Sequence, residues 1–207
     1  MQLKKYVVNL MKKLNNYKTY KDYLLHQAAK TTDPYRREKW LGKEWDIKLD
    51  GFKKIFIEKE ELLKECRNVL CVGARTGQEV VALKDLGYHA VGIDLIPCAP
   101  HVIHGDMHNL EFENNSFDCV FSNVFDHSLH PEKKCSEIER VLSPDGVIIM
   151  QFQLNVSQDK YTEVEINSLL DDVVPLFDNC TVVSCGPIAA NFAAMNHELV
   201  LRKNLSS

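Results

Sequence analysis

Residues 69–80 read VLCVGARTGQEV, and this stretch decides how the rest of the chain is interpreted. A short apolar run leads into two glycines four residues apart, Gly73 and Gly77, and a helical pattern follows at once. The stretch therefore predicts a strand over residues 68–73, a glycine turn, and a helix over residues 76–86. A turn of this kind, at the beginning of a helix, is a common place for a small ligand to bind.

Two side chains in the turn restrict the class of ligand. In a dinucleotide-binding loop, further glycines let the backbone approach a pyrophosphate and let the helix pack closely on the strand. Arg75 and Gln78 stand at those positions here, so a close pyrophosphate cradle is not expected. An arginine is instead a favourable neighbour for a carboxylate. The turn indicates an adenosyl ligand that carries a carboxylate in place of a pyrophosphate.

Strand-like and helix-like segments alternate after this turn. Strands are expected at residues 89–95, 102–106, 117–123, 147–154, 181–185 and 198–202, helices at residues 132–142 and 164–177, and a turn at 143–146 (SPDG). Alternation with short connections predicts a Rossmann-like, doubly wound α/β fold. Its sheet is expected to have seven strands, mostly parallel with an antiparallel last strand, and helices on both faces.

The first 60 residues are expected to form a helical cap, followed by the α/β domain at residues 61–207. Five apolar residues fall at the spacing of one helix face: Val7, Leu10, Met11, Leu14 and Tyr17. Residues 1–43 hold eleven Lys and Arg against three Asp and Glu, a net charge of +8, whereas the remainder carries −12. Basic residues interleaved with tyrosines could also follow an RNA backbone, so both interpretations stay open.

Ligands of such sheets bind at the carboxyl ends of the strands, and polar residues follow three of the predicted strands. Asp94 could accept hydrogen bonds from ribose hydroxyls. Asp106 could accept from an adenine amino group with Met107 beside the ring, or it could simply cap a turn. Asn123, Asp126 and His127 follow the fourth strand, where a reacting group would lie.

These residues together resemble class I S-adenosylmethionine-dependent methyltransferases, within the broad group of type 11 methyltransferase domains. That family's first motif, acid-x-G-x-G-x-G, is similar to CVGARTG at residues 71–77. The second-strand acid, the GD after the third strand, FDCVFSN and IERVLSPDGVIIM also match the family, over residues 66–154. The chain departs from it at Cys71, where the family has an acid, and at Arg75, where it has a glycine.

The resemblance implies S-adenosylmethionine as the cofactor and places its binding residues at Gly73, Ala74, Arg75, Thr76, Gly77, Asp94, Leu95, Asp106, Met107, Asn123 and Val124. It implies methyl transfer by in-line displacement, in which the protein mainly aligns the reacting atoms. A catalytic base is needed only when the acceptor loses a proton, and His127 or Asp126 is placed for that role. The missing acid at Cys71 also leaves open a catalytically silent binding protein.

The methyl acceptor is expected to be a small molecule, because the core carries no added nucleic-acid module. RNA or a protein held by the basic N-terminus is the alternative. Trp40 and Trp45 could cover the acceptor or only anchor the cap to the domain. A metal site is not expected, because His101, His104 and His108 do not converge on one face of a short strand.

Two further features concern the compartment. No apolar run approaches the ~18 residues of a membrane-spanning helix. The seven cysteines form no C-x-x-C pair and fit reduced thiols, so a cytoplasmic protein is expected. The sequence does not indicate the oligomeric state.

Overall fold

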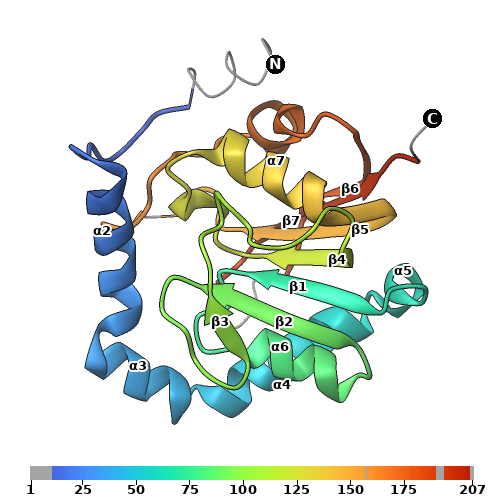
Figure 1. The fold of residues 1–207 in the computed structure, drawn as a ribbon, viewed down its shortest axis with the longest axis horizontal. Coiled ribbons are helices and arrows are strands. Elements are labelled where there is room, and N and C mark those ends of the chain that lie inside the picture. Colours follow the sequence, from blue (N-terminus) through green and yellow to red (C-terminus); the bar gives the residue numbers. More distant parts are fainter. Residues whose placement is uncertain (1–10, 157, 190–193, 206–207) are drawn as a thin grey trace.

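Seven strands form one mixed sheet in the computed structural model, which describes residues 11–156, 158–189 and 194–205 (Figure 1). The strands are β1 (Asn68–Val72), β2 (His89–Asp94), β3 (Val102–His104), β4 (Phe117–Ser122), β5 (Leu142–Phe152), β6 (Cys180–Pro187) and β7 (His197–Lys203). The helices are α2 (Tyr20–Thr32), α3 (Pro34–Leu41), α4 (Trp45–Ile57), α5 (Glu60–Leu63), α6 (Gln78–Asp85) and α7 (Pro131–Val141), with the short turns η1 (Phe125–His127), η2 (Leu169–Val173) and η3 (Val174–Leu176).

The strand order is β3-β2-β1-β4-β5-β7-β6. Strands β1 to β5 pair in parallel, whereas β7 lies antiparallel between β5 and β6. This confirms the predicted doubly wound fold with an antiparallel last strand. The order reverses at β1 and β4, so a ligand crevice is expected at the carboxyl ends of these two neighbours.

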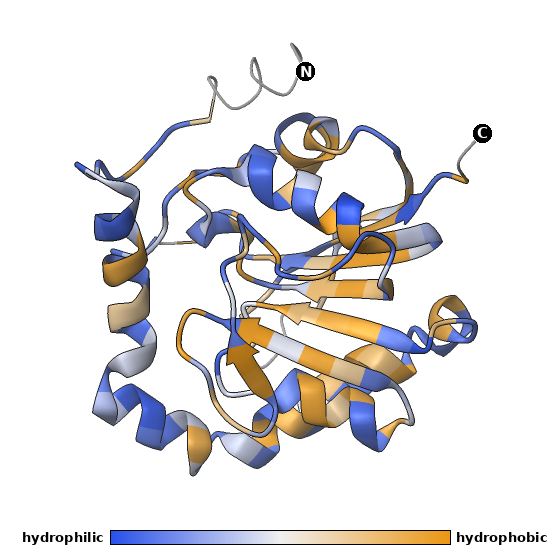
Figure 2. Ribbon diagram, viewed as in Figure 1, coloured by the Kyte–Doolittle hydropathy of each residue, from blue (hydrophilic) through white to orange (hydrophobic). Residues whose placement is uncertain are grey.

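The two faces of the sheet are buried by different helices, as the alternation of side chains along β1 shows. Val69 and Cys71 belong to an apolar cluster with α4, α5 and α6. Leu70 and Val72 belong to a second cluster, with α7, η2 and η3 on the opposite face. Figure 2 shows the resulting concentration of hydrophobic residues along the central strands. Burial on both faces explains why β1 reads as an unbroken apolar run.

Helices α2 and α3 run along the edge at which the parallel strands end (Figure 1). Thr19 and Asp22 form a capping box that begins α2, and the Asp33 side chain caps α3 directly before Pro34. Helix α4 instead packs against α6 and contributes Phe52, Ile55 and Phe56 to the cluster beneath the sheet. The division of the chain near residue 60 stays a prediction.

Three local predictions were wrong. Residues 11–17 are not helical: Lys13 bridges Val164, and the Leu14 amide donates to the Glu163 carbonyl, so tertiary backbone pairing replaces the helix. Val7 and Leu10 lie outside the described residues. The helix expected over 164–177 is reduced to η2 and η3, because Pro175 cannot donate a helical hydrogen bond. The turn at 143–146 lies inside β5, which begins at Leu142, and Asp145 takes a φ of 63° there.

Among the described residues, none of the helices combines the length and the hydrophobicity that a membrane-spanning segment requires.

Lys134 of α7 is fully buried beneath the end of β4. Its amine donates to Ser122 Oγ at 3.1 Å and lies 5.5 Å from the Phe125 ring centroid. Among the described residues no carboxylate pairs with it, and burial lowers its pKa to about 8. The folded protein therefore carries a buried positive charge without a direct ion-pair partner at neutral pH.

We expect Lys134→Met to increase the free energy of unfolding at pH 7. In the unfolded chain the lysine stays charged up to its ordinary pKa of 10.5, whereas in the folded protein it loses its proton near pH 8. The lysine therefore lowers the free energy of unfolding by its full amount below pH 8. This penalty decreases as the pH rises from 8 and disappears near 10.5. The shift corresponds to on the order of 3 kcal/mol as an upper bound. Urea unfolding at pH 7 and 9.5 measures this difference between the two proteins; a constant difference across this range would contradict the assignment.

Candidate functional site

Two adjoining cavities lie where β1, β2 and β4 end. The first, here called the Asp94 cavity, is lined by Tyr23, Gln27, Lys30, Thr31, Gly73, Arg75, Ile93, Asp94, Leu95, Gly105, Asp106, Met107, Val124 and His127. The second, the Trp40 cavity, has a volume of about 410 Å³ and is lined by residues of α2 to α4, the glycine turn, the segment after β4 and Asp159. Lys30, Gly73, Arg75, Val124 and His127 line both cavities.

The glycine turn has a shape that side chains at its two glycines would prevent. Gly73 has a φ of 82°, and a Cβ there would lie 2.2 Å from Val124 Cγ2. Gly77 has a φ of 89°, and a Cβ there would lie 2.8 Å from the Cβ of His101. Both positions thus require glycine for conformation and for space. The ends of β1 and β4 can approach each other only because Gly73 lacks a side chain.

Asp94, at the end of β2, stabilises the glycine turn by accepting a hydrogen bond from its backbone. Its Oδ2 accepts from the Arg75 amide at 3.2 Å, and its Oδ1 accepts from the Ile96 amide at 3.0 Å. Burial raises the pKa of this carboxyl, although these two amides and the positive charge of Arg75 oppose the rise. A carboxylate accepts about four hydrogen bonds in all, so both oxygens keep capacity for hydroxyl groups of a ligand.

Arg75 and Gln78 attach the cap to the glycine turn. The Arg75 guanidinium lies 4.4 Å from the centroid of the Trp40 ring, a cation–π contact. Gln78 Nε2 donates to the Trp40 carbonyl at 2.9 Å, and Thr76 Oγ1 donates to Gln78 Oε1 at 2.7 Å. The two residues that replace glycines of a pyrophosphate loop therefore bind α3, and the space left beside them is the Trp40 cavity.

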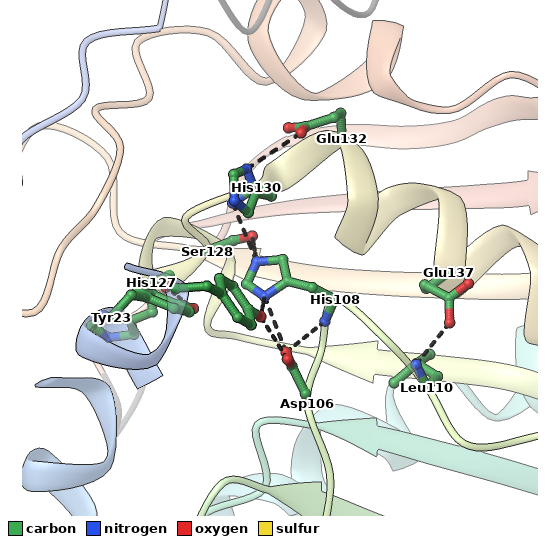
Figure 3. A network of polar contacts seen from close by, with 10 residues as sticks. Tyr23, Asp106, His108, Leu110, His127, Ser128, His130, Glu132 and Glu137 are labelled. Carbon is green, nitrogen blue, oxygen red and sulfur yellow. Dashed lines mark hydrogen bonds and ion pairs between the residues drawn. The ribbon is translucent and has the colours of Figure 1, made fainter. Parts of the chain in front are cut away.

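Asp106 is part of a polar network that joins α2 to the segments after β3 and β4 (Figure 3). Its Oδ2 accepts from the Tyr20 hydroxyl at 2.5 Å, and its Oδ1 accepts from the His108 amide at 2.9 Å. The His130 amide donates to His108 Nε2 at 3.2 Å, so the proton of a neutral His108 is on Nδ1, 3.1 Å from Asp106 Oδ1. Burial raises the Asp106 pKa, but the hydrogen bonds from His108 and Tyr20 outweigh burial and lower it overall.

His127 is held in one orientation by its surroundings. Its Nδ1 lies 2.7 Å from the Tyr161 carbonyl, which can only accept a hydrogen bond. In the neutral ring Nδ1 therefore carries the proton, and Nε2 is the acceptor. Lys30 Nζ lies 3.1 Å from that Nε2 and 2.9 Å from Asp159 Oδ2. Burial lowers the pKa values of both His127 and Lys30, so each is more readily neutral than in water.

The structure brings together nearly all of the residues predicted from sequence. Every one except Gly77 lines at least one cavity; Gly77 is the N-cap residue directly before α6 and shapes the turn. The roles assigned to them stay predictions. Sequence reasoning missed the contribution of α2, namely Tyr23, Gln27, Lys30 and Thr31. Gln27, Lys30 and Thr31 follow Tyr23 by four, seven and eight residues, so the four side chains lie on one face of the helix. Because three of them are polar, this face shows no hydrophobic periodicity that would have identified it from the sequence.

Comparison with known proteins agrees with this geometry. Residues 70–150, from β1 to β5, match the family model described as a methyltransferase domain. A comparison with curated proteins found no match.

Solved structures at low identity show the same fold. An N1-methyltransferase from Burkholderia thailandensis, crystallised with 1,6-didemethyltoxoflavin and S-adenosylhomocysteine, aligns with a TM-score of 0.69 at 13% identity, covering 94% of this chain and 95% of that one. A protein from Pyrococcus horikoshii OT3 aligns at 0.63 and 17%, covering 85% and 96%. A chain from a complex with a methyltransferase activator of Haloferax volcanii aligns at 0.55 and 16%, covering 78% and 98%. Residues 70–150 of this chain therefore match a methyltransferase domain, and the chain shares its fold with these solved structures.

Proposed function

We propose that the protein transfers the methyl group of S-adenosylmethionine to a small molecule bound in the Trp40 cavity. The observation that carries this proposal is the position of Lys30 and His127, which line both cavities and therefore stand between a cofactor and an acceptor. Both are ionisable groups able to exchange protons, and Asp126 lines the acceptor side beside them.

The residues present fit the cofactor. Asp94 would hold the ribose hydroxyls, Asp106 and Met107 the adenine, and Gly73 would let the ligand lie against the backbone of the turn. When bound, the cofactor supplies a sulfonium methyl group that a nucleophile can displace. The amino-acid tail of the cofactor would extend past Gly73 into the Trp40 cavity, beside the acceptor, where the cations Arg75 and Lys48 would meet its carboxylate.

A proton from the acceptor would leave through Lys30 and His127. A neutral Lys30 amine can take that proton directly, and the resulting ammonium donates to His127 Nε2 and Asp159, both already within hydrogen-bond distance. Lys30 is therefore a candidate base in addition to His127, and Asp159 stabilises its charged form. Asp126 and His127 remain the catalytic candidates indicated by the sequence.

Several observations favour a small molecule over RNA. Trp40 is buried against the glycine turn and forms a wall of the cavity. Basic side chains at the site already have partners: Lys30 pairs with Asp159, Lys48 with Glu44, and the Arg36 guanidinium lies over the Tyr161 ring. The Burkholderia relative was crystallised with a small heterocyclic compound, although another neighbour came from a complex with an activator protein.

Asp94→Ala is expected to weaken S-adenosylhomocysteine binding by about 1–3 kcal/mol, because two ribose hydroxyls lose their acceptor. Isothermal titration calorimetry measures the affinity, and circular dichroism verifies the fold. Asp118→Ala is the matched control: that carboxylate also accepts from two backbone amides, Arg67 and Asn68 at 2.9 Å, but lies at the opposite end of the parallel strands. Equal losses in both variants would contradict a ribose role for Asp94.

Methyl transfer is tested by incubating the protein with methyl-labelled S-adenosylmethionine and two pools: small hydroxyl, amino and thiol compounds, and total RNA. Label should enter the small-molecule pool. Lys30→Met and His127→Gln should each reduce that transfer at least tenfold while S-adenosylhomocysteine affinity changes less than threefold, because the loss of a positioned base affects chemistry more than cofactor binding. Label confined to RNA would overturn the small-molecule proposal.

A wild-type enzyme that needs neutral Lys30 and His127 should become more active as the pH rises. Burial lowers both pKa values, so the loss of activity on acidification should occur below their ordinary values of 10.5 and 6.5. Initial rates between pH 5 and 10 measure this, with Lys30→Arg as the comparison because arginine keeps the charge but does not titrate. A rate independent of pH would contradict the assignment.

A further inference from the structure

Position 71 of this chain is uncharged. Cys71 lies in the middle of β1 with no exposed surface, on the face covered by α4 and α6. Burial raises the pKa of its thiol well above the ordinary value of 9.0, so the thiol stays neutral. The family's acid at this position anchors the part of the cofactor that carries a positive ammonium group, and a neutral thiol cannot supply that attraction.

A carboxylate on a different element acts on this position. Glu79, in the first turn of α6, has 5% of its surface exposed, and its charge is the strongest of those acting on the Cys71 thiol. Its side chain lines the Trp40 cavity together with Gly73 and Arg75. Within the described residues, no ion pair or hydrogen bond to another side chain engages this carboxyl group.

We propose that Glu79 binds the ammonium group of the cofactor's amino-acid tail, in the role that the family assigns to an acid at position 71. This inference rests on the proposed function, because it assumes that S-adenosylmethionine is the ligand. It explains how the chain can lack the motif's acid and keep the cofactor: the charge has moved from the strand to the helix that follows the glycine turn.

The charges around Glu79 suit a zwitterionic tail. Arg75 of the turn and Lys48 of α4 lie near it and favour its ionised form, whereas Asp94 of β2 opposes ionisation. Burial outweighs these effects and raises the Glu79 pKa to about 8, so the carboxyl is mostly protonated at pH 7 before a ligand binds. An ammonium group arriving beside it would favour the carboxylate and expel the proton, while Arg75 and Lys48 face the ligand's own carboxylate.

The test compares two ligands that share the adenosine and thioether but differ in the tail. S-adenosylhomocysteine carries the amino-acid tail, and methylthioadenosine lacks it. Glu79→Gln should weaken S-adenosylhomocysteine binding roughly 10- to 100-fold, the range for a charge-assisted hydrogen bond, and leave methylthioadenosine binding within threefold. Asp85→Asn is the control, because it also removes a carboxylate from α6. The Asp85 carboxylate pairs with Lys53 at 2.7 Å and lines neither cavity.

A second measurement needs no variant. Titration of the wild-type protein with S-adenosylhomocysteine at pH 7, in buffers of different ionisation enthalpy, should show the release of a proton that methylthioadenosine does not release. Glu79→Gln should abolish that release if it folds. No difference in proton release between the two ligands, or an equal loss of affinity for both in Glu79→Gln, would overturn this inference alone. Failure of the wild-type protein to bind S-adenosylhomocysteine would overturn the proposed function as well.

Discussion

The close approach of β1 and β4 at Gly73 is the constraint on which the rest of the site depends. A Cβ at Gly73 would lie 2.2 Å from Val124, so any side chain there would push apart the two strands between which the sheet order reverses. With the strands in contact, the segments that follow them meet at one edge. Asp94 from β2 then closes the turn by accepting from the Arg75 amide. The two cavities lie between the segments that follow these strands.

The second determinant is the way in which helices from the N-terminal part of the chain are held over that edge. Several of the contacts are hydrogen bonds. The Tyr20 hydroxyl binds Asp106, the Tyr23 hydroxyl donates to the His127 carbonyl at 2.9 Å, and Gln78 binds the Trp40 carbonyl. Hydrogen bonds of this kind require defined geometry, so α2 and α3 are placed relative to the strand ends with their polar groups turned inward.

Burial of ionisable groups is the common physical theme of the site. Lys30, His127, Glu79 and Asp94 all lie where desolvation favours the neutral form, and each has opposite charges close by that favour the ionised form. Groups balanced in this way change protonation in response to a ligand or a reacting proton, whereas exposed groups at the same pH do not. The fully buried Lys134 differs in its direct contacts: its amine donates to Ser122 Oγ, and among the described residues it forms no ion pair with a carboxylate.

The sequence by itself determined the α/β core and most of the strand-end residues, because buried parallel strands read as apolar runs and the residues after them are local in sequence. Glycine spacing identified the turn for the same reason. Only the tertiary structure decided that residues 11–17 are not helical, since their backbone partners lie near residue 163. It also decided that Lys30 of α2 meets His127, and that Glu79 of α6 lines the same cavity as Gly73 and Arg75. Each of these features depends on how separate elements pack together. Periodicity along the chain predicts single elements but not the distances between them.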